Sequence, residues 1–525
     1  MNPTSLTRSV YFLTVFFTGA AVLIIEVAAI RMLAPYFGSS LSVLSSVLTV
    51  VLAALSVGYF IGGRIADRMP FFLPLYTIIG TAGIIMLALQ IVSLNLLPYS
   101  NQFFSLATGP LILSLILFFI PAFLLGIDSP FVIKLLTKDL DQDHAGAIVG
   151  STFFWSTIGS IVGSLSAGFW LIPTLGLTHT ITVVSVALIV WAIVAATILT
   201  YLTRHDTTLP RFPFSSLWLV AIGSIAGILL AQYVLTLQTS SVQGTTLYKA
   251  DGYYSNIHIY DATRGTTTYR FLKNDINNSS AIIPGSNEIV FAYAQFANLF
   301  TTHIPDAQNY LVLGGGSYTI PRHMYLSHPE LTIDVVETEP LLYPLAQKYF
   351  ELPVSPRILN HEMDARVFLQ STTTTYDVIF SDIMNSGYYL PPHVATIEFF
   401  ESLRARLSPD GIAIINFIGS LDTSEKTLTG SVIKTITSVF PNMTLLAING
   451  PKNPDIQNIL FVVRHEGKPI TIPSDLRIKN IFTGTTTAAT AMIVNQDTLT
   501  LDNQVIFHDD KSELEPLVFA QFKKL

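Results

Sequence analysis

The chain has 525 residues, of which only 12% are charged, and its mean hydropathy is +0.53. This composition is too apolar for an ordinary soluble protein. The sequence contains no cysteine, which excludes disulfides, thiolate metal ligands and cysteine nucleophiles.

The charges are unevenly placed along the chain. Residues 1–239 contain 8 Lys+Arg and 7 Asp+Glu, and residues 240–525 contain the remaining 20 and 28 of the totals 28 and 35. We therefore predict a transmembrane helical bundle over residues 1–239 and a boundary after it. The second part has a formal charge of 20 − 28 = −8 and no basic stripe, which argues against nucleic acid as a partner.

The first part contains seven apolar stretches that are long enough to cross a lipid bilayer as helices. They lie near residues 9–33, 41–63, 71–97, 104–126, 147–172, 177–202 and 213–235. Basic residues flank every second connection, namely Arg8, Arg64, Arg68, Lys134, Lys138, Arg204 and Arg211. The positive-inside rule then predicts a multi-pass protein of the plasma or inner membrane with a cytoplasmic N-terminus.

This topology leaves the side of the second part open. Seven crossings from a cytoplasmic start place residues 240–525 outside the cytoplasm, whereas nucleoside metabolites are normally cytoplasmic. Either Ser129–Leu136 is re-entrant and the count falls by one, or the second part faces outward.

Some polar and small residues interrupt the apolar spans. Two Gly-x-x-x-Gly pairs, beginning at Gly58 and Gly159, favour close helix packing within the bundle over a dimer face. Glu26 and Arg31 in the first span, and Asp128 at the end of the fourth, are ionisable groups that are costly inside a membrane. Arg31 can extend to the interface, so Glu26 is the candidate for a structural buried pair or for a pathway or ligand role.

The second part begins with alternating short strands, Asn256–Tyr260 and Thr268–Leu272, which predict a small β-domain over residues 240–288. From residue 289 to 525, helices and strands alternate as in a doubly wound α/β sheet. The expected helices are Ile289–Thr301, Thr319–Leu326 and Leu341–Tyr349, and the expected strands are Tyr310–Leu313, Leu331–Val336, Tyr376–Ser381, Ile412–Phe417 and Ile459–Val463.

Glycines or carboxylates follow three of these strands and a further strand that is expected to end before Asp364. They are Gly314, Gly315 and Gly316, then Glu337, Asp364 and Asp382. In a doubly wound sheet, ligands bind beyond the carboxyl ends of the strands, so this order predicts a nucleoside site. The glycines let the backbone approach the ligand, and Glu337 can accept both ribose hydroxyls. Asp364 can accept an adenine amino group, and Asp382 can act as a base or hold a cation. Each carboxylate, taken alone, can also be a helix cap or a solvated loop residue.

These residues resemble the polyamine aminopropyltransferases, the spermidine synthase family, and in particular their membrane-fused members. The resemblance covers about residues 244–465 and rests on Val312–Gly316, Val336-Glu337, Asp364-Ala-Arg, Tyr376–Asp382 and Thr396–Phe400. It implies a methyltransferase-like nucleoside-binding domain in which Glu337 holds the ribose, Asp364 the adenine, and Asp382 is the general base. The implied substrate is S-adenosylmethionine or its decarboxylated form, with no prosthetic group and no metal, and the implied product is 5′-methylthioadenosine. A polyamine is the implied acceptor, and homodimers are common in the family.

The resemblance also marks polar residues near the substrate. Asn278, Tyr293 and Gln295 lie where the family places substrate-contacting side chains. Ser317 stands where the family has an Asp that pairs with the amino group of the decarboxylated donor, and Asn385 stands where it has a second Asp. Both changes remove charges used to recognise amines, which weakens the prediction of a diamine acceptor.

Four functional classes remain open at this point. The first is aminopropyl transfer to an amine. The second is cleavage of S-adenosylmethionine by its own carboxylate, giving methylthioadenosine and homoserine lactone. The third is a transporter or sensor regulated by a nucleoside-binding domain, and the fourth is a methyltransferase, which shares the same nucleoside site.

Overall fold

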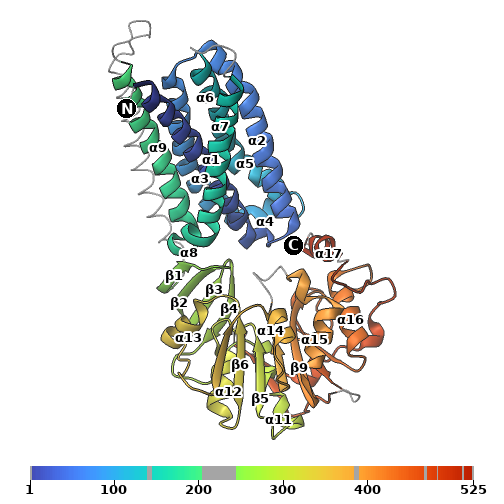
Figure 1. Cartoon of the computed structure of the whole chain (residues 1–525). Coiled ribbons are helices and arrows are strands. Elements are labelled where there is room, and N and C mark those ends of the chain that lie inside the picture. Colours follow the sequence, from blue (N-terminus) through green and yellow to red (C-terminus); the bar gives the residue numbers. More distant parts are fainter. Residues whose placement is uncertain are drawn as a thin grey trace. The chain divides into compact units, whose positions relative to one another are not determined.

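The computed structural model describes residues 3–138, 145–203, 244–383, 390–465, 470–481, 483–510 and 513–522. The chain divides into two compact units, Met1–Ser241 and Val242–Leu525. Each unit has its own set of elements (Figure 1).

The first unit is helical. Six helical segments within the described residues are long and apolar enough to cross a membrane: Ser5–Phe37, Leu41–Arg68, Phe72–Tyr99, Gly109–Thr137, Ala145–Leu175 and Leu177–Leu202. They are built from α1 (Pro3–Phe37), α2 (Leu41–Arg68), α3 (Phe72–Leu96), α5 (Gly109–Gly126), α6 (Asp128–Thr137), α7 (Ala145–Ser166), α8 (Ile172–Leu175) and α9 (Leu177–Leu202). The stretch predicted near 213–235 lies outside the described residues.

The segment considered as re-entrant, Ser129–Leu136, is part of α6. This helix follows directly after α5, and the two belong to one candidate span, Gly109–Thr137. The segment is therefore helical rather than an irregular loop, and its path relative to the bilayer stays a prediction.

Glycines bring helices of the first unit into backbone contact, as their spacing predicts. A Cβ atom on Gly62 of α2 would lie 2.8 Å from Ile127 Cα, and one on Gly163 of α7 would lie 2.3 Å from the Ala20 carbonyl oxygen of α1. Any larger residue would force these helices apart. The prediction that the two Gly-x-x-x-Gly pairs pack helices within one chain is confirmed.

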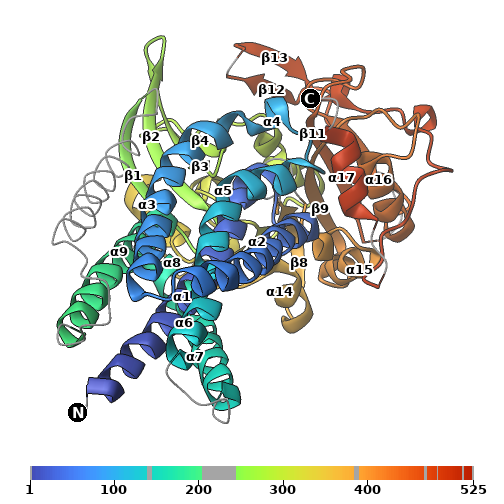
Figure 2. The same cartoon turned by 90° about the horizontal axis from the view of Figure 1, so that it is seen from above.

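The second unit begins with a four-stranded antiparallel sheet in the order β1-β2-β3-β4. Its strands are β1 (Thr245–Asp251), β2 (Asn256–Arg264), β3 (Thr267–Asn274) and β4 (Asn277–Ile282). A separate two-stranded hairpin, β12 (Arg477–Asn480) and β13 (Thr485–Ala488), occurs late in the chain and is clearest in the turned view (Figure 2).

The main sheet of the second unit has seven strands in the order β10-β11-β9-β8-β5-β6-β7. They are β5 (Asn309–Leu313), β6 (Thr332–Glu337), β7 (Ile358–Glu362), β8 (Tyr376–Ser381), β9 (Leu407–Gly419), β10 (Thr444–Ala447) and β11 (Gln457–Arg464). Strands β5 to β9 pair in parallel, and β10 and β11 are antiparallel. The chain winds outward from β5 in one direction and then resumes at β8 on its other side. A ligand crevice is expected where the order reverses, between the ends of β5 and β8.

Helices cover the main sheet. They are α12 (Thr319–Ser327), α13 (Leu342–Tyr349), α14 (Ala365–Ser371), α15 (Ile397–Ala405) and α16 (Leu428–Val439), and α17 (Leu514–Phe522) packs against α16. Tyr310 and Val312 of β5 pack in one buried cluster with Met324 of α12 and Ala346 of α13. Both faces of β5 are buried, which explains its continuous apolar run.

The predicted continuous helix over Ile289–Thr301 is wrong. The structure has a 3₁₀ helix, Tyr293–Asn298, followed by the short α-helix Phe300–His303. One reason is that the Gln295 side chain donates to the Ile289 carbonyl oxygen at 3.2 Å. A side chain that occupies a backbone acceptor in this way competes with helical hydrogen bonding.

Candidate active site

The glycine loop after β5 is locked to the end of β8. Gly314 has φ +91°, in the region that favours glycine, and a Cβ atom there would lie 2.2 Å from the Asp382 carbonyl oxygen. The Asp382 amide donates to the Leu313 carbonyl at 2.7 Å, and the Gly314 amide donates to Val336 at 2.9 Å. Glycine is therefore required at 314 both for the backbone angle and for the space.

Glu337, at the end of β6, is held against the same loop. Its Oε2 accepts from the amides of Gly315 and Gly316 at 2.9 and 3.1 Å, and its Oε1 accepts from the Glu339 amide at 2.9 Å. Burial raises the pKa of the Glu337 carboxyl, and the three amides oppose that rise by stabilising the anion. The predicted ribose-binding carboxylate and the predicted glycines thus form one connected structure.

Asp382 follows β8 and accepts two hydrogen bonds from side chains. The Tyr293 hydroxyl donates to Oδ2 at 2.8 Å, and Asn416 Nδ2 donates to Oδ1 at 2.8 Å. Burial raises the pKa of Asp382, and both donors act in the opposite direction. Burial, and then the charge of Asp382, raise the pKa of Tyr293 well above its usual value, which keeps its hydroxyl protonated as a donor.

A second asparagine, Asn458, fixes the orientation of the Asn416 side chain. Asn458 Nδ2 donates to Asn416 Oδ1 at 3.0 Å, so the amide nitrogen of Asn416 is directed toward Asp382. Asn416 pairs with Leu460 in the β9–β11 ladder and Asn458 with Ile418, so the two asparagines are diagonal neighbours on one face. We did not predict either residue from the sequence. The available signal was a single amide inside the apolar strand Ile412–Phe417, where a buried polar group needs a partner.

Asp364 lies after β7 and begins α14. Its Oδ1 accepts from the amides of Arg366 and Val367 at 2.8 and 3.2 Å. Asp364 therefore caps the N-terminus of α14, which was the alternative role given for this carboxylate. Its Oδ2 is 2.9 Å from Nε2 of His393, a residue that sequence reasoning missed. The hydrogen bond to His393 lowers the pKa of Asp364. The predicted adenine contact remains a prediction, and it requires His393 to share or release Oδ2.

Ser317 closes the glycine loop and is only 2% exposed. Its amide donates to Ser280 Oγ at 3.1 Å, while its own hydroxyl oxygen is buried without a hydrogen-bond partner among the described residues. A buried hydroxyl without a partner is costly, and such groups often mark a place where a ligand completes the hydrogen bonding.

The remaining predicted substrate contacts are dispersed. Asn278 of β4 accepts from the Tyr260 hydroxyl at 2.9 Å. Gln295 donates to Lys479 O at 2.8 Å and accepts from Lys479 N at 3.0 Å, so its amide joins the 3₁₀ helix to β12. Asn385 lies outside the described residues. The substrate roles of all three stay predictions.

Glu339 is a further residue that sequence reasoning missed. It is 3% exposed and accepts from the Tyr254 amide at 2.7 Å. Because its own amide donates to Glu337, it connects the turn after β1 with the carboxylate that is predicted to bind the ribose. Among the residues that the structure describes, no group of three or more His, Asp or Glu side chains is arranged to hold a metal ion.

The sequence of the chain was compared with known proteins. No protein-family model matches it. Over 136 residues it is 29% identical to a polyamine aminopropyltransferase of Vibrio vulnificus, covering 25% of this chain and 45% of that protein. Over 494 residues it is 23% identical to polyamine aminopropyltransferase 1 of Streptomyces coelicolor, covering 89% of this chain and 86% of that protein. The chain is related to the spermidine synthase-like family.

The chain is also similar to other proteins. The human eEF1A lysine and N-terminal methyltransferase is 27% identical over 181 residues, which cover 32% of this chain and 24% of that protein. The solved structure of a probable spermidine synthase from Corynebacterium glutamicum is 22% identical, with a TM-score of 0.41, covering 51% of this chain and 98% of that one. The solved structure of spermidine synthase from Thermotoga maritima is 14% identical, with a TM-score of 0.35, covering 53% of this chain and 84% of that one. The chain spans less than half of the length of the Vibrio vulnificus relative, 45%. The curated relatives of this chain include aminopropyltransferases and a methyltransferase.

Proposed function

We propose that this chain is a membrane-integrated, spermidine synthase-like enzyme that binds S-adenosylmethionine or its decarboxylated form and transfers an aminopropyl group to an amine. The observation that carries the proposal is the position of Asp382. Its backbone touches the glycine loop at Gly314, and its carboxylate is oriented by Tyr293 and Asn416. The similarity to aminopropyltransferases supports the same general reaction.

The proposed mechanism assigns a role to each strand end. The glycine loop and Glu337 hold the ribose, and Asp364 holds the adenine amino group. The amine nitrogen attacks the carbon next to the sulfonium, so that a C–N bond forms and the C–S bond breaks. The electron pair of that bond stays on sulfur, which leaves as neutral 5′-methylthioadenosine. Asp382 accepts the proton of the attacking amine, and the enzyme contributes mainly alignment and proton removal.

Cleavage without an amine is a second candidate, and Ser317 is the observation that favours it. This neutral hydroxyl, which has no hydrogen-bond partner among the described residues, does not repel the carboxylate of S-adenosylmethionine. That carboxylate could attack its own chain at the carbon next to sulfur, forming a C–O bond as the C–S bond breaks. The products would be methylthioadenosine and homoserine lactone, and no base would be needed.

Mass spectrometry of the products distinguishes these reactions. The purified full-length protein is incubated with each sulfonium donor, with and without putrescine. Transfer predicts methylthioadenosine only when amine is present, cleavage predicts it without amine, and methylation predicts S-adenosylhomocysteine. Asp382→Asn is expected to abolish transfer, because the isosteric amide cannot accept the proton. Turnover that is unchanged in Asp382→Asn contradicts the proposed base.

We also propose a location and an assembly. The distribution of basic residues supports a plasma or inner membrane protein whose N-terminus is cytoplasmic. A homodimer is proposed by analogy with the family, and light scattering of the protein in detergent would test it.

A further inference from the structure

A carboxylate is buried inside the first unit, apart from the proposed active site. Asp128 begins α6 just after α5 ends at Gly126, and only 1% of the residue is exposed. It lies six residues before Lys134, which pairs with Asp67 at 2.8 Å. Six helical residues correspond to about 9 Å, so Asp128 lies well inside its candidate span.

Only one of the two oxygens of Asp128 has a partner. The Thr18 hydroxyl of α1 donates to Oδ2. Oδ1 is buried and has no hydrogen-bond partner in the part of the chain that the structure describes. None of the ion pairs found among the described residues involves Asp128. An ionised carboxylate in this position would lack a compensating charge.

The neighbouring helices α1 and α2 carry cations, among them Arg31 and Arg64, but the side chains found to interact with Asp128 are hydroxyls. The ionisable side chains that interact electrostatically with Asp128 are Tyr59 of α2 and Tyr76 of α3. The sequences of α5 and α7 contain no Asp, Glu, Lys, Arg or His. On α6 itself the cation is Lys134, which is engaged with Asp67 of α2.

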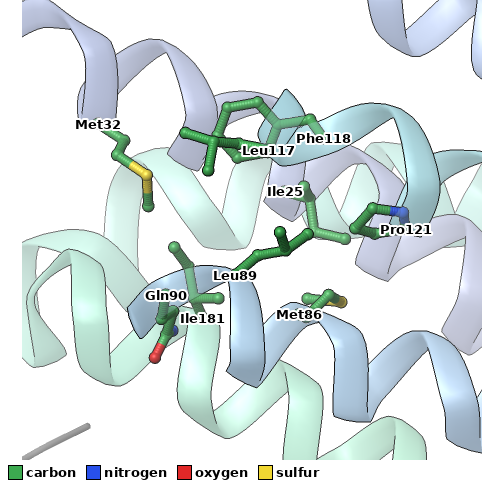
Figure 3. A pocket seen from close by; sticks show the side chains of 9 residues that line it. All are labelled: Ile25, Met32, Met86, Leu89, Gln90, Leu117, Phe118, Pro121 and Ile181. Atoms are coloured by element: carbon green, nitrogen blue, oxygen red, sulfur yellow. The ribbon is translucent and has the colours of Figure 1, made fainter. Parts of the chain in front are cut away.

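Close helix packing separates Asp128 from the pocket found in the first unit. A Cβ atom on Gly58 would lie 3.0 Å from Gly126 Cα, so α2 contacts the backbone just before Asp128. A pocket elsewhere in the bundle lies between α1, α3, α5 and α9 (Figure 3), and its lining does not include Asp128. The polar residue in that lining, Gln90, is hydrogen-bonded to Thr178 and Thr182 of α9. The pocket is therefore apolar, and it is not the binding site for a polar ligand of Asp128.

We propose that Asp128 is a proton-binding site of the first unit. Its carboxyl group takes up and releases one proton reversibly. An unpaired carboxylate inside a bilayer costs several kcal/mol, and a proton neutralises it without requiring a cavity. A metal cation would need more oxygen ligands, and the described residues form no metal-binding group. In the exchange the carboxyl O–H bond breaks as a water molecule takes up the proton, and it forms again by the reverse transfer, while the Thr18 hydroxyl donates to the anion. This site does not depend on the proposed transferase function.

A hydrophobic carbodiimide, dicyclohexylcarbodiimide, tests the proposal on the full-length protein in liposomes. It reacts with protonated carboxyls by adding the O–H across a C=N bond, so the adduct carries the whole reagent. Peptide mass spectrometry is expected to find the adduct on Asp128 at acidic pH and to lose it as the pH rises. Thr18→Val should extend labelling to higher pH, because the anion loses its donor. Asp67, exposed and paired with Lys134, is the internal control that should stay unlabelled.

Infrared spectroscopy gives a readout that does not depend on reagent access. The spectrum of the wild type minus that of Asp128→Asn should show the carbonyl stretch of a protonated carboxylic acid at acidic pH and its loss at alkaline pH. Absence of that band at acidic pH overturns the proposal. A band that persists unchanged at every pH at which the protein stays folded also overturns it, because the proton would then be a fixed part of the structure.

Discussion

At the scale of single residues, Asp382 combines burial with two hydrogen-bond donors. Burial raises its pKa, while Asn416 and Tyr293 stabilise the ionised form. A base must be ionised, so the proposed reaction should be lost as the pH falls through this raised pKa. The acidic limb of the kcat/KM profile is therefore expected above the pH at which an exposed aspartate titrates.

The asparagine pair provides a direct test of this balance. Asn416→Leu removes a donor to the anion, so the acidic limb should move to higher pH and kcat/KM at neutral pH should fall about tenfold, the value of one hydrogen bond to a charged group. Asn458→Leu leaves Asn416 in place but frees its amide to rotate, so it should move the limb in the same direction by less. A uniform loss of activity at all pH values in both variants would instead indicate a structural role.

Ser317 gives a prediction about the donor. Ser317→Asp introduces a carboxylate where the Ser317 hydroxyl is buried without a described partner. It should favour the decarboxylated donor, whose amine it can pair with, and disfavour S-adenosylmethionine, whose carboxylate it repels. The ratio of kcat/KM for the two donors should shift by about tenfold or more. Ser317→Ala is the neutral control, and an equal effect of both variants on the ratio contradicts a charge-based explanation.

At the scale of elements, the contact between the β5 loop and the end of β8 should be sensitive to one methyl group. Gly314→Ala would place a Cβ atom 2.2 Å from the Asp382 carbonyl oxygen, at φ +91°. Gly450 has a similar φ of +98° and nothing within 4 Å of its Cβ position, so Gly450→Ala isolates the backbone strain, about 1–3 kcal/mol. Thermal unfolding should show a larger loss of stability for Gly314→Ala, and calorimetry should show loss of nucleoside binding only in that variant. Equal losses in the two would mean that the clash relaxes freely.

The elements also show what the sequence can and cannot predict. Apolar strands that end in Gly314, Glu337 and Asp382 predicted the sheet, because parallel strands bring their carboxyl ends to one edge. The asparagines at 416 and 458 were missed, because their contact depends on the antiparallel register of β9 and β11, which no local pattern encodes. His393 was missed because its contact with Asp364 joins positions 29 residues apart in the chain, which no local pattern encodes. The helix expected from residue 289 failed because the Gln295 side chain competes for a backbone carbonyl.

At the scale of the whole molecule, the unequal distribution of charge matches the two compact units. The first unit contains the six candidate spans of the described residues, and its basic residues other than Arg31 lie at or near span ends. Because Arg64 and Arg68 end the second span, the connection after it is expected on the cytoplasmic side, and the connection before it on the opposite side.

The absence of cysteine from the sequence makes this orientation directly measurable, since a single introduced cysteine is the only thiol in the protein. Ser39, before α2, and Met69, after it, are both exposed. In intact cells a membrane-impermeant maleimide should label Ser39→Cys, and it should label Met69→Cys only after the membrane is permeabilised. The reverse pattern contradicts a cytoplasmic N-terminus, because the two positions lie at opposite ends of one span. Thr266→Cys, in the exposed turn between β2 and β3, then reports the side of the second unit, and labelling from the same side as Met69 is required if its substrate is a cytoplasmic nucleoside.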